Sequence, residues 1–465
     1  MFMGVGRTLL VSTGSLVACP MPTLRGRSQT RPGSMVPTEP RRGTTCHKRP
    51  HQTAPAEPVL IGADTIGLMR IVVVGAGVMG TWTALWLRRA GHSVTLIDRH
   101  GPGNRLCSSG DESRITRSSH GADRHYPTWQ RRALDQWREL ERSAGEQLFE
   151  PAGVVWLANE AQTFEAESHD SLAALGIPVE RWSTDELAAR VPVLDPEGIP
   201  WALFEPEAGA LFARPAVMAA QDRFRAEGGE IIVARVAPPA ASADGSLGRI
   251  RLDDGAMLDA DAFVFACGPW LPDLFPDVLG ELIVPHRQDV IHFAVPPGDD
   301  RWAPGRLPVW IDFEGSFYGF PSFDGVGAKA CPDWLGPVER PDDSAREVAE
   351  ETIEASRSLL RRRFPGLADQ PVVRRWTCFY EVTPDANFVI DRHPTLGDTW
   401  IAGGGTGHGF KHGPVIGQYL AALVTGDAQA AAELAPPDQR FALGPRGASA
   451  SFRTSGRVPA SIAQP

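Results

Sequence analysis

The chain of 465 residues predicts an α/β fold with two parts: a Rossmann-like dinucleotide-binding domain assembled from separate stretches of sequence, and a second domain built on a mixed or antiparallel β-sheet with helices. Near residue 70 an apolar run, a glycine-rich turn, a helical stretch and another apolar run follow one another directly, as in a βαβ unit. Two later apolar runs, Ala262–Ala266 and Thr399–Ala402, also end next to glycine. Uninterrupted apolar runs of this length are typical of strands buried in a parallel sheet.

The βαβ unit opens the folded part of the chain. Met69–Val74 reads MRIVVV and is apolar from Ile71 onward, which predicts a short buried strand. Thr81–Ala90 is predicted to be the helix, and Ser93–Ile97 the second strand, which ends on Asp98.

The turn in this unit, Gly75-Ala76-Gly77-Val78-Met79-Gly80, has the GxGxxG pattern. In this pattern Gly75 makes the tight turn, Gly77 lets a pyrophosphate approach the backbone, and Gly80 lets helix pack on strand. The phosphate binds at the helix N-terminus, beside the backbone of Val78 and Met79, where N–H groups lack helical partners. Asp98 lies 18 residues past Gly80 and is placed to accept a hydrogen bond from a ribose hydroxyl. A bound dinucleotide is therefore predicted, rather than a purely structural turn.

Later segments favour FAD over NAD, although both use this pattern. Ile250–Leu252 and Met257–Leu258 predict a hairpin that turns at Asp254-Gly255 and leads into the Ala262–Ala266 strand and Gly268. A dinucleotide domain interrupted in this way suits a flavoprotein better than a nicotinamide dehydrogenase.

A dense group of glycines after the Thr399–Ala402 strand would let the backbone lie against a planar ring. The glycines are Gly403, Gly404, Gly405, Gly407 and Gly409. The predicted helix Pro414–Val424 would direct the positive end of its dipole to the same place, where it suits the negatively charged edge of a reduced flavin.

Composition excludes several other classes. The net charge of −10 argues against a nucleic-acid partner, and no apolar stretch reaches the roughly 18–20 residues of a membrane-spanning helix. Six cysteines without CxxC or paired spacing argue against a zinc site or a disulfide framework, and predict reduced thiols in the cytoplasm. Only three of the 46 basic residues are lysines, Lys48, Lys329 and Lys411, so arginine supplies the ordinary surface cations.

Both ends of the chain differ from its body. Residues 1–68, rich in proline and arginine, are predicted to be a disordered or non-native extension, with Met69 as the true start. Alternatively, Thr8–Ala18 resembles a weak signal sequence and Leu16-Val17-Ala18-Cys19 a lipoprotein cleavage motif. Residues 445–465 are predicted to be a flexible tail.

Several blocks of sequence resemble the monomeric sarcosine oxidase and N-methyltryptophan oxidase family of flavin amine oxidases, within the D-amino-acid oxidase superfamily. Their order and spacing extend across nearly all of residues 69–435, and the later ones are the more specific. The blocks are Ile71–Asp98, Ser108–Gly121, Phe317–Lys329, Thr377–Pro394 and Gly403–Gly413.

The resemblance implies a monomeric FAD-dependent oxidase of carboxylate-bearing secondary amines, such as sarcosine or N-methyl amino acids. It implies hydride transfer to flavin N5, an imine product and reduction of O2 to hydrogen peroxide. It also implies that the FAD is bound covalently through a thioether to Cys378. The FAD-binding domain is expected to comprise residues 69–146, 207–278 and 386–436, and the substrate domain residues 147–206 and 279–385.

The resemblance also implies roles for three cations. Lys329 is expected near flavin N5, in contact through water, where a compact ammonium stabilises negative charge as oxygen is reduced. Lys411 and Arg117 are expected to hold the substrate carboxylate and orient the amine over the flavin, with Lys411 also contacting the cofactor.

Further residues of the same blocks are expected at the site. Tyr380 follows Cys378 by two residues, so strand alternation places both side chains on one face. His408 is expected to hydrogen-bond the flavin or the substrate, and Ser109 and Arg114 to contact the flavin.

Two departures from the family touch the expected pocket. This chain has Ala330-Cys331-Pro332-Asp333 after the lysine, where sarcosine enzymes tend to carry a histidine. It also has Ser108-Ser109-Gly110-Asp111 where they have histidines. The resemblance therefore predicts the reaction class more firmly than sarcosine itself as the substrate.

Two other functions stay open on the sequence. The first is a flavin dehydrogenase or D-amino-acid-type oxidase with non-covalent FAD. The second, from a different class, is a non-catalytic flavin-binding assembly protein. The joint presence of Lys329, Cys378 and Lys411 argues against the second.

Overall fold

The computed structural model describes residues 67–159, 164–242, 244–313 and 315–447, which belong to one compact unit. The predictions for residues 1–66 and 448–465, including the signal-like segment, lie outside the described residues.

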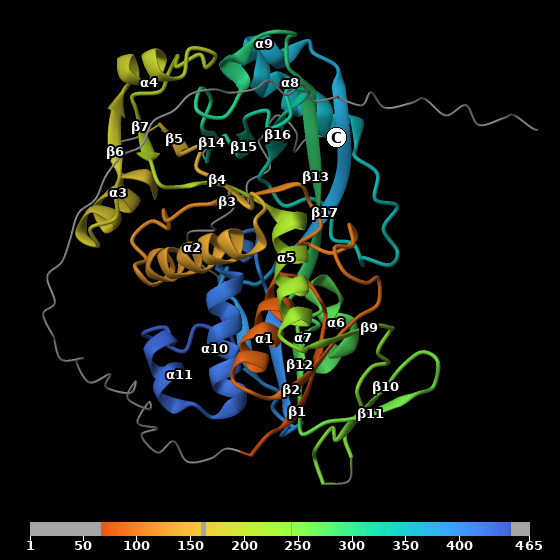
Figure 1. Ribbon diagram of the computed structural model, residues 1–465. Coiled ribbons are helices and arrows are strands. Elements are labelled where there is room, and N and C mark those ends of the chain that lie inside the picture. The colour runs from red at the N-terminus through yellow and green to blue at the C-terminus, as the bar shows by residue number, and fades with distance from the viewer. Residues whose placement is uncertain (1–66, 160–163, 243, 314, 448–465) are drawn as a thin grey trace, which may run out of the picture. The chain divides into compact units, whose positions relative to one another are not determined.

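A six-stranded sheet carries the βαβ unit, in the lower half of Figure 1. Its order is β18-β19-β12-β1-β2-β9, with every pair parallel except β18 and β19. The strands are β1 (Arg70–Val74), β2 (Ser93–Asp98), β9 (Glu230–Val233), β12 (Ala262–Phe265), β18 (Val389–Arg392) and β19 (Thr399–Gly403). The three apolar runs are therefore neighbours in one sheet, and the α/β fold class predicted from the sequence is confirmed.

Apolar side chains on both faces of this sheet are buried. In β1, Ile71 and Val73 join a core with helices α1 (Val78–Arg89), α5 (Ala213–Ala226) and α10 (Gly413–Thr425), whereas Val72 and Val74 join a second core on the opposite face. The two-sided burial explains why the run shows no polar alternation. Helix α1 packs against both α5 and α10.

Helix α1 begins at Val78, three residues before the start predicted at Thr81. Gly77 occupies the N-cap position, and its carbonyl accepts a hydrogen bond of 2.9 Å from the Thr81 N–H. The glycine pattern therefore includes the first helical turn, so the prediction placed the start of the helix too late. Helix α10 extends one residue beyond each end of the predicted Pro414–Val424.

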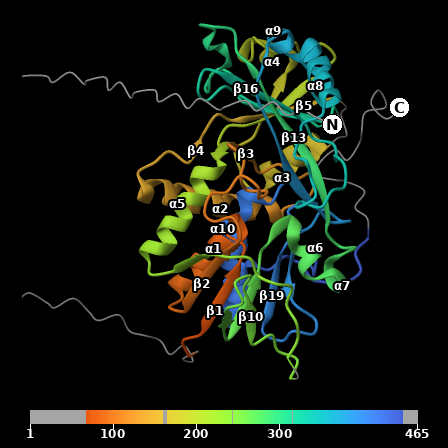
Figure 2. The same cartoon turned by 90° about the vertical axis from the view of Figure 1, so that its right-hand side faces the viewer.

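An eight-stranded mixed sheet forms the upper part of Figure 1, with order β17-β13-β16-β15-β14-β5-β7-β6. All its pairs are antiparallel except β14 and β5. Its strands are β5 (Val154–Ala158), β6 (Glu180–Ser183), β7 (Trp201–Glu205), β13 (Val284–Ala294), β14 (Val309–Asp312), β15 (Phe317–Phe320), β16 (Gly327–Pro332) and β17 (Val372–Val382). Helix α8 (Glu350–Arg363) packs against β16, and the long strands β13 and β17 lie side by side (Figure 2).

Two small sheets complete the strands of the described residues. β3 (Ser113–Thr116), β8 (Gly209–Phe212) and β4 (Phe149–Glu150) form one sheet. The antiparallel pair β10 (Arg249–Arg251) and β11 (Met257–Asp259) is the predicted hairpin. The division of residues 69–436 into two domains stays a prediction.

Seven further α-helices lie within the described residues. They are α2 (His125–Ala144), α3 (Phe164–Ala174), α4 (Thr184–Arg190), α6 (Leu271–Leu274), α7 (Pro276–Leu279), α9 (Pro365–Ala368) and α11 (Ala428–Leu434). Within the described residues, no helix is both long and apolar enough to cross a lipid bilayer.

Candidate functional site

A cavity of about 330 Å³ lies at the carboxyl ends of β1, β2 and β12. Ligands of open α/β sheets bind at this edge of the strands. Many of the predicted cofactor residues line the cavity. They are Gly75, Gly77, Val78, Met79, Asp98, Ser109, Arg114, Gly268, Gly405, Gly407 and Gly409.

The glycine-rich turn fits a closely approaching ligand. Gly75 has φ of +102°, and a Cβ there would lie 2.4 Å from the Ala266 carbonyl oxygen. A Cβ on Gly80 would lie 1.9 Å from the Gly75 carbonyl oxygen, so Gly80 serves helix–strand packing and does not line the cavity. These contacts leave no room for side chains at either position, which matches the roles of the first and third glycines in a dinucleotide turn.

Asp98 ends β2 at the wall of this cavity. Its carboxylate accepts hydrogen bonds from the backbone N–H groups of Ala76 (2.9 Å) and His100 (2.8 Å). These bonds fix the carboxylate beside the glycine-rich turn, where a ribose would lie.

The wall of the same cavity also contains a buried acid, Glu381, that was not singled out from the sequence. Glu381 follows Tyr380 on β17 and accepts hydrogen bonds from the Ser108 hydroxyl (2.8 Å) and the Gly405 N–H (3.4 Å). Burial raises the pKa of the Glu381 carboxyl. The residue is a candidate hydrogen-bond donor to a ring in this cavity when protonated.

A second cavity of about 70 Å³ adjoins the first, since Arg114, Tyr380, Gly407 and Phe410 line both. The predicted residues Cys378, Arg117, Lys411 and His408 also line this smaller cavity. Its other walls include Trp156 and Tyr318, which were not singled out from the sequence as site residues. Asp333, which belongs to one of the two departures from the family pattern, also lines this cavity. Trp156 and Tyr318 lie on strands of the eight-stranded sheet.

Two buried cations face this small cavity from different segments. Arg117 follows β3, donates to the Ser119 carbonyl, and lies with its guanidinium carbon 4.8 Å from the centre of the Trp156 ring. Lys411 lies in the short helix η3 (Phe410–His412), and its Nζ donates to the His408 carbonyl at 2.9 Å. The stacking and hydrogen bonds position both charges at the cavity.

Lys329 makes a buried ion pair that the sequence analysis did not anticipate. Its Nζ lies 2.6 Å from Asp111 Oδ2 and 3.4 Å from the Ser113 carbonyl oxygen. The Lys329 and Asp111 residues are 1% and 3% exposed. Asp111 Oδ2 also pairs with the Arg114 guanidinium, so one carboxylate balances two cations.

Electrostatics in this group follow from burial and from that pairing. Burial alone would raise the pKa of the Asp111 carboxyl, but Lys329 and Arg114 lower it below its usual value. Burial, with the Lys329 ammonium nearby, lowers the pKa of His292 to about 3, so this histidine is neutral at pH 7. Burial raises the pKa of the Cys378 thiol, an effect that Arg114 opposes.

Three predicted residues lie outside both cavities. They are Gly80, Gly404 and Lys329. Gly404 follows β19 and has φ of +68°. A Cβ at this position would lie 2.7 Å from the Thr383 side chain, so Gly404 is needed for the tight turn and does not contact the cavity. The Lys329 ammonium pairs with Asp111, and Asp111 pairs with Arg114, which lines both cavities.

A cleft over a glycine-rich βαβ turn, at the carboxyl ends of parallel strands, is typical of proteins that bind a nucleotide cofactor, and here a small cavity with two buried cations adjoins it. The chain belongs to the FAD dependent oxidoreductase (DAO) family, whose model matches residues 70–423. It is thus a FAD-dependent oxidoreductase, as the sequence predicted.

Individual relatives agree with this membership. The chain is 31% identical over 360 residues to a monomeric sarcosine oxidase of Streptomyces avermitilis, covering 76% of this chain and 92% of that protein. It is 26% identical over 364 residues to an N-methyl-L-tryptophan oxidase of Yersinia pestis, covering 77% and 95%. The suspected resemblance is confirmed: the chain is a DAO-family FAD-dependent oxidoreductase related to sarcosine and N-methyl amino acid oxidases.

Solved structures show the same fold. A fructosyl peptide oxidase from E. terrenum superposes with a TM-score of 0.72 at 23% identity, covering 84% of this chain and 96% of that one. An L-proline dehydrogenase from P. horikoshii superposes with a TM-score of 0.67 at 22% identity, covering 77% and 94%.

Proposed function

We propose that this protein is an FAD-dependent oxidase of small secondary amines that bear a carboxylate, in the manner of sarcosine and N-methyl amino acids, giving an imine and hydrogen peroxide. The observation that carries the proposal is the pair of buried cations, Arg117 and Lys411, on a cavity of about 70 Å³ beside the larger cleft. Two cations on one small cavity match one carboxylate and limit the size of the amine.

The cavity walls would orient the substrate. Arg117 and Lys411 bind the carboxylate, while Trp156 and Phe410 supply apolar contact for the carbon chain. Burial raises the pKa of the Tyr380 phenol well above its ordinary value, so its hydroxyl stays protonated and can donate to a substrate or ring atom.

The residues of the larger cleft fit FAD. The glycine-rich turn and the N-terminus of α1 would hold the pyrophosphate, and Asp98 a ribose. When bound, FAD would supply the redox chemistry, taking one hydride, which carries two electrons, from the carbon beside the amine nitrogen and passing two electrons on to oxygen. Cys378 lies on the wall of the adjoining cavity and is the proposed point of covalent attachment.

A second candidate is a flavin dehydrogenase of the same amines. It is favoured by the pairing of Lys329 with Asp111, since a buried carboxylate at 2.6 Å offsets the ammonium charge expected to promote reaction with oxygen. The rate of flavin reoxidation by oxygen separates the two candidates.

The proposed partners are a small-molecule amine with a carboxylate and O2. A monomer in the cytoplasm remains the predicted state of the chain. None of the four described cysteines (Cys107, Cys267, Cys331 and Cys378) forms a disulfide.

A peroxide-coupled screen tests the proposal. N-methyl and cyclic amino acids should give peroxide, and the carboxamide of the best substrate should lose at least about 100-fold in kcat/KM, since it cannot pair with two cations. The Lys411→Met variant should lose most of this preference for acid over amide. Equal rates with acid and amide in the unaltered protein would exclude the proposed carboxylate site, and an absence of peroxide despite turnover would favour the dehydrogenase.

A further inference from the structure

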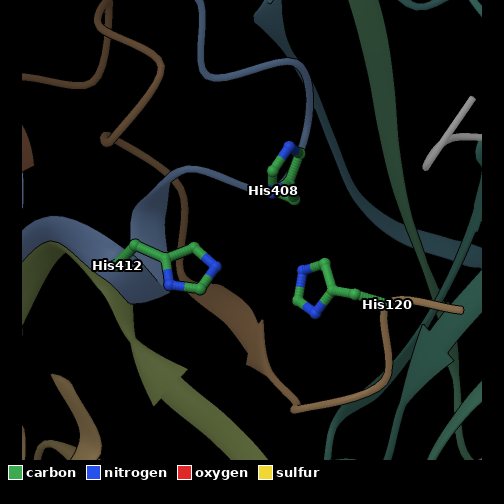
Figure 3. Close-up of side chains that lie close together, drawn as sticks. All are labelled: His120, His408 and His412. Atoms are coloured by element: carbon green, nitrogen blue, oxygen red, sulfur yellow. The ribbon is translucent and has the colours of Figure 1, made fainter. Parts of the chain in front are cut away.

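Three buried histidines from two distant segments come together beside the small cavity. His120 follows β3, whereas His408 lies two residues before the short helix η3 and His412 is the last residue of that helix. One ring nitrogen from each lies within 4.8 Å of those of the other two. The residues are 4%, 4% and 0% exposed, and Figure 3 shows their rings around a common point, with a nitrogen of His120 and one of His412 turned toward each other.

Hydrogen bonds to backbone carbonyls set the tautomers of two of these rings. His120 Nδ1 lies 2.9 Å from the Ser118 carbonyl oxygen, and His408 Nε2 lies 3.0 Å from the Ala386 carbonyl oxygen. A carbonyl oxygen only accepts, so each of these nitrogens carries the proton. In the neutral ring, Nε2 of His120 and Nδ1 of His408 then present lone pairs. Histidines that bind metals are typically oriented in this way, with the other N–H on a carbonyl or carboxylate.

We propose that His120, His408 and His412 form a binding site for one divalent transition-metal ion of the zinc class. Neutral imidazole is a preferred ligand of such ions, and three histidines leave one coordination position open. Ligand atoms on a tetrahedral zinc ion are roughly 3.3 Å apart at Zn–N bonds of ~2.0–2.1 Å. The ring nitrogens, which lie within 4.8 Å of one another, therefore need to approach by up to about 1.5 Å around the ion.

The surroundings of the cluster suit a structural ion. Tyr126 stacks on His120 with ring centres 5.2 Å apart, and Phe388 stacks on His408 at 4.8 Å, so aromatic rings hold the imidazoles in place. The buried Glu205 carboxylate accepts from the Ser118 N–H (2.6 Å) and the Ser119 hydroxyl (2.6 Å), which places a negative charge on the segment just before His120.

The ion would join the two segments that carry the proposed substrate cations. Arg117 lies three residues before His120, and Lys411 lies between His408 and His412 and donates to the His408 carbonyl. A metal bound to all three rings would therefore cross-link the loop after β3 to the loop before α10 and fix the spacing of the two cations. The site is independent of turnover, since binding requires neither flavin chemistry nor substrate.

Titration of the metal-free full chain with Zn²⁺ tests the site. The protein is prepared without a polyhistidine tag, stripped with a chelator and titrated by calorimetry, with the thermal unfolding midpoint measured in parallel. One equivalent is expected to bind and to raise Tm, since the ion binds only the folded cluster. His120→Gln and His412→Gln should each lower the affinity for this Zn²⁺ ion by at least about tenfold. His169→Gln, which changes a partly exposed histidine on α3 that is not one of the three rings, should leave Zn²⁺ binding unchanged.

Crystals of the unaltered protein grown with Zn²⁺ give a test that needs no variant. An anomalous peak between the three rings would support the site. Three results would overturn it. They are an anomalous peak only at other places in the protein, no Zn²⁺ bound in the titration, or an affinity for Zn²⁺ that is unchanged in both cluster variants. The result for the metal site does not depend on the proposed oxidase function. The Zn²⁺ titration measures metal binding, whereas the substrate screen measures production of peroxide.

Discussion

Replacing Lys329 with methionine is expected to slow the reoxidation of the reduced flavin by oxygen by about 100- to 1000-fold, the range that loss of one preorganised electrostatic contact produces. Anaerobic reduction by substrate should change less than about tenfold, because the proposed substrate cations are Arg117 and Lys411, which this variant keeps. Methionine is close to lysine in size, one atom shorter, and removes the charge together with the hydrogen bonds that Nζ donates to Asp111 and Ser113. Both half-reactions are measured separately by stopped-flow absorbance of the flavin.

The double variant Lys329→Met/Asp111→Asn provides the matched control. Asp111→Asn alone leaves a buried ammonium without its carboxylate, which costs about 3–5 kcal/mol in comparable cores. In the Lys329→Met single variant Asp111 keeps Arg114 as a partner, and the double variant removes both charges of the pair. The double variant should therefore regain stability relative to Asp111→Asn while remaining slow with oxygen. If both half-reactions slow equally in Lys329→Met, Lys329 has a structural role and not the proposed one.

Replacing Cys378 with serine is expected to abolish covalent attachment of the flavin. After acid precipitation, the unaltered protein should keep its yellow flavin in the pellet, whereas the variant should release all of it as free FAD. The reason is that attachment requires a thiolate beside the ring, and Cys378 is the cysteine that lines the smaller cavity. The readout is the flavin absorbance of pellet and supernatant.

Cys331 is the matched control for this substitution. It is buried in the same small cluster as Cys378 and Val290, but it lines neither cavity. Cys331→Ser should leave the flavin in the pellet. Release of FAD by acid from the unaltered protein would contradict the covalent link at Cys378, while leaving the FAD site and the proposed reaction intact.

The sequence predicted those features that depend on local pattern. The βαβ unit follows from apolar runs and glycine spacing within 30 residues, and the hairpin follows from its Asp254-Gly255 turn. Strand alternation correctly placed Cys378 and Tyr380 on one cavity. The start of α1 was misplaced because glycines of the turn also supply the first helical turn.

The buried ion pair between Lys329 and Asp111 could not be predicted from local sequence pattern. Asp111 and Lys329 are separated by 218 residues, and Asp111 stood in the sequence only as a departure from the family pattern. The histidine cluster likewise depends on how the loop after β3 packs against η3, which no local period encodes. Glu381 was missed because a lone acid in a strand carries no signal until its burial is known.

The most direct test of the central claim is the absorbance of the bound flavin during anaerobic addition of the best N-methyl or cyclic amino acid, followed by admission of air. The proposal predicts that the amino acid bleaches the flavin, that its carboxamide does not, and that air restores the yellow colour with one equivalent of hydrogen peroxide per flavin. A flavin that no carboxylate-bearing secondary amine bleaches would contradict the proposed function.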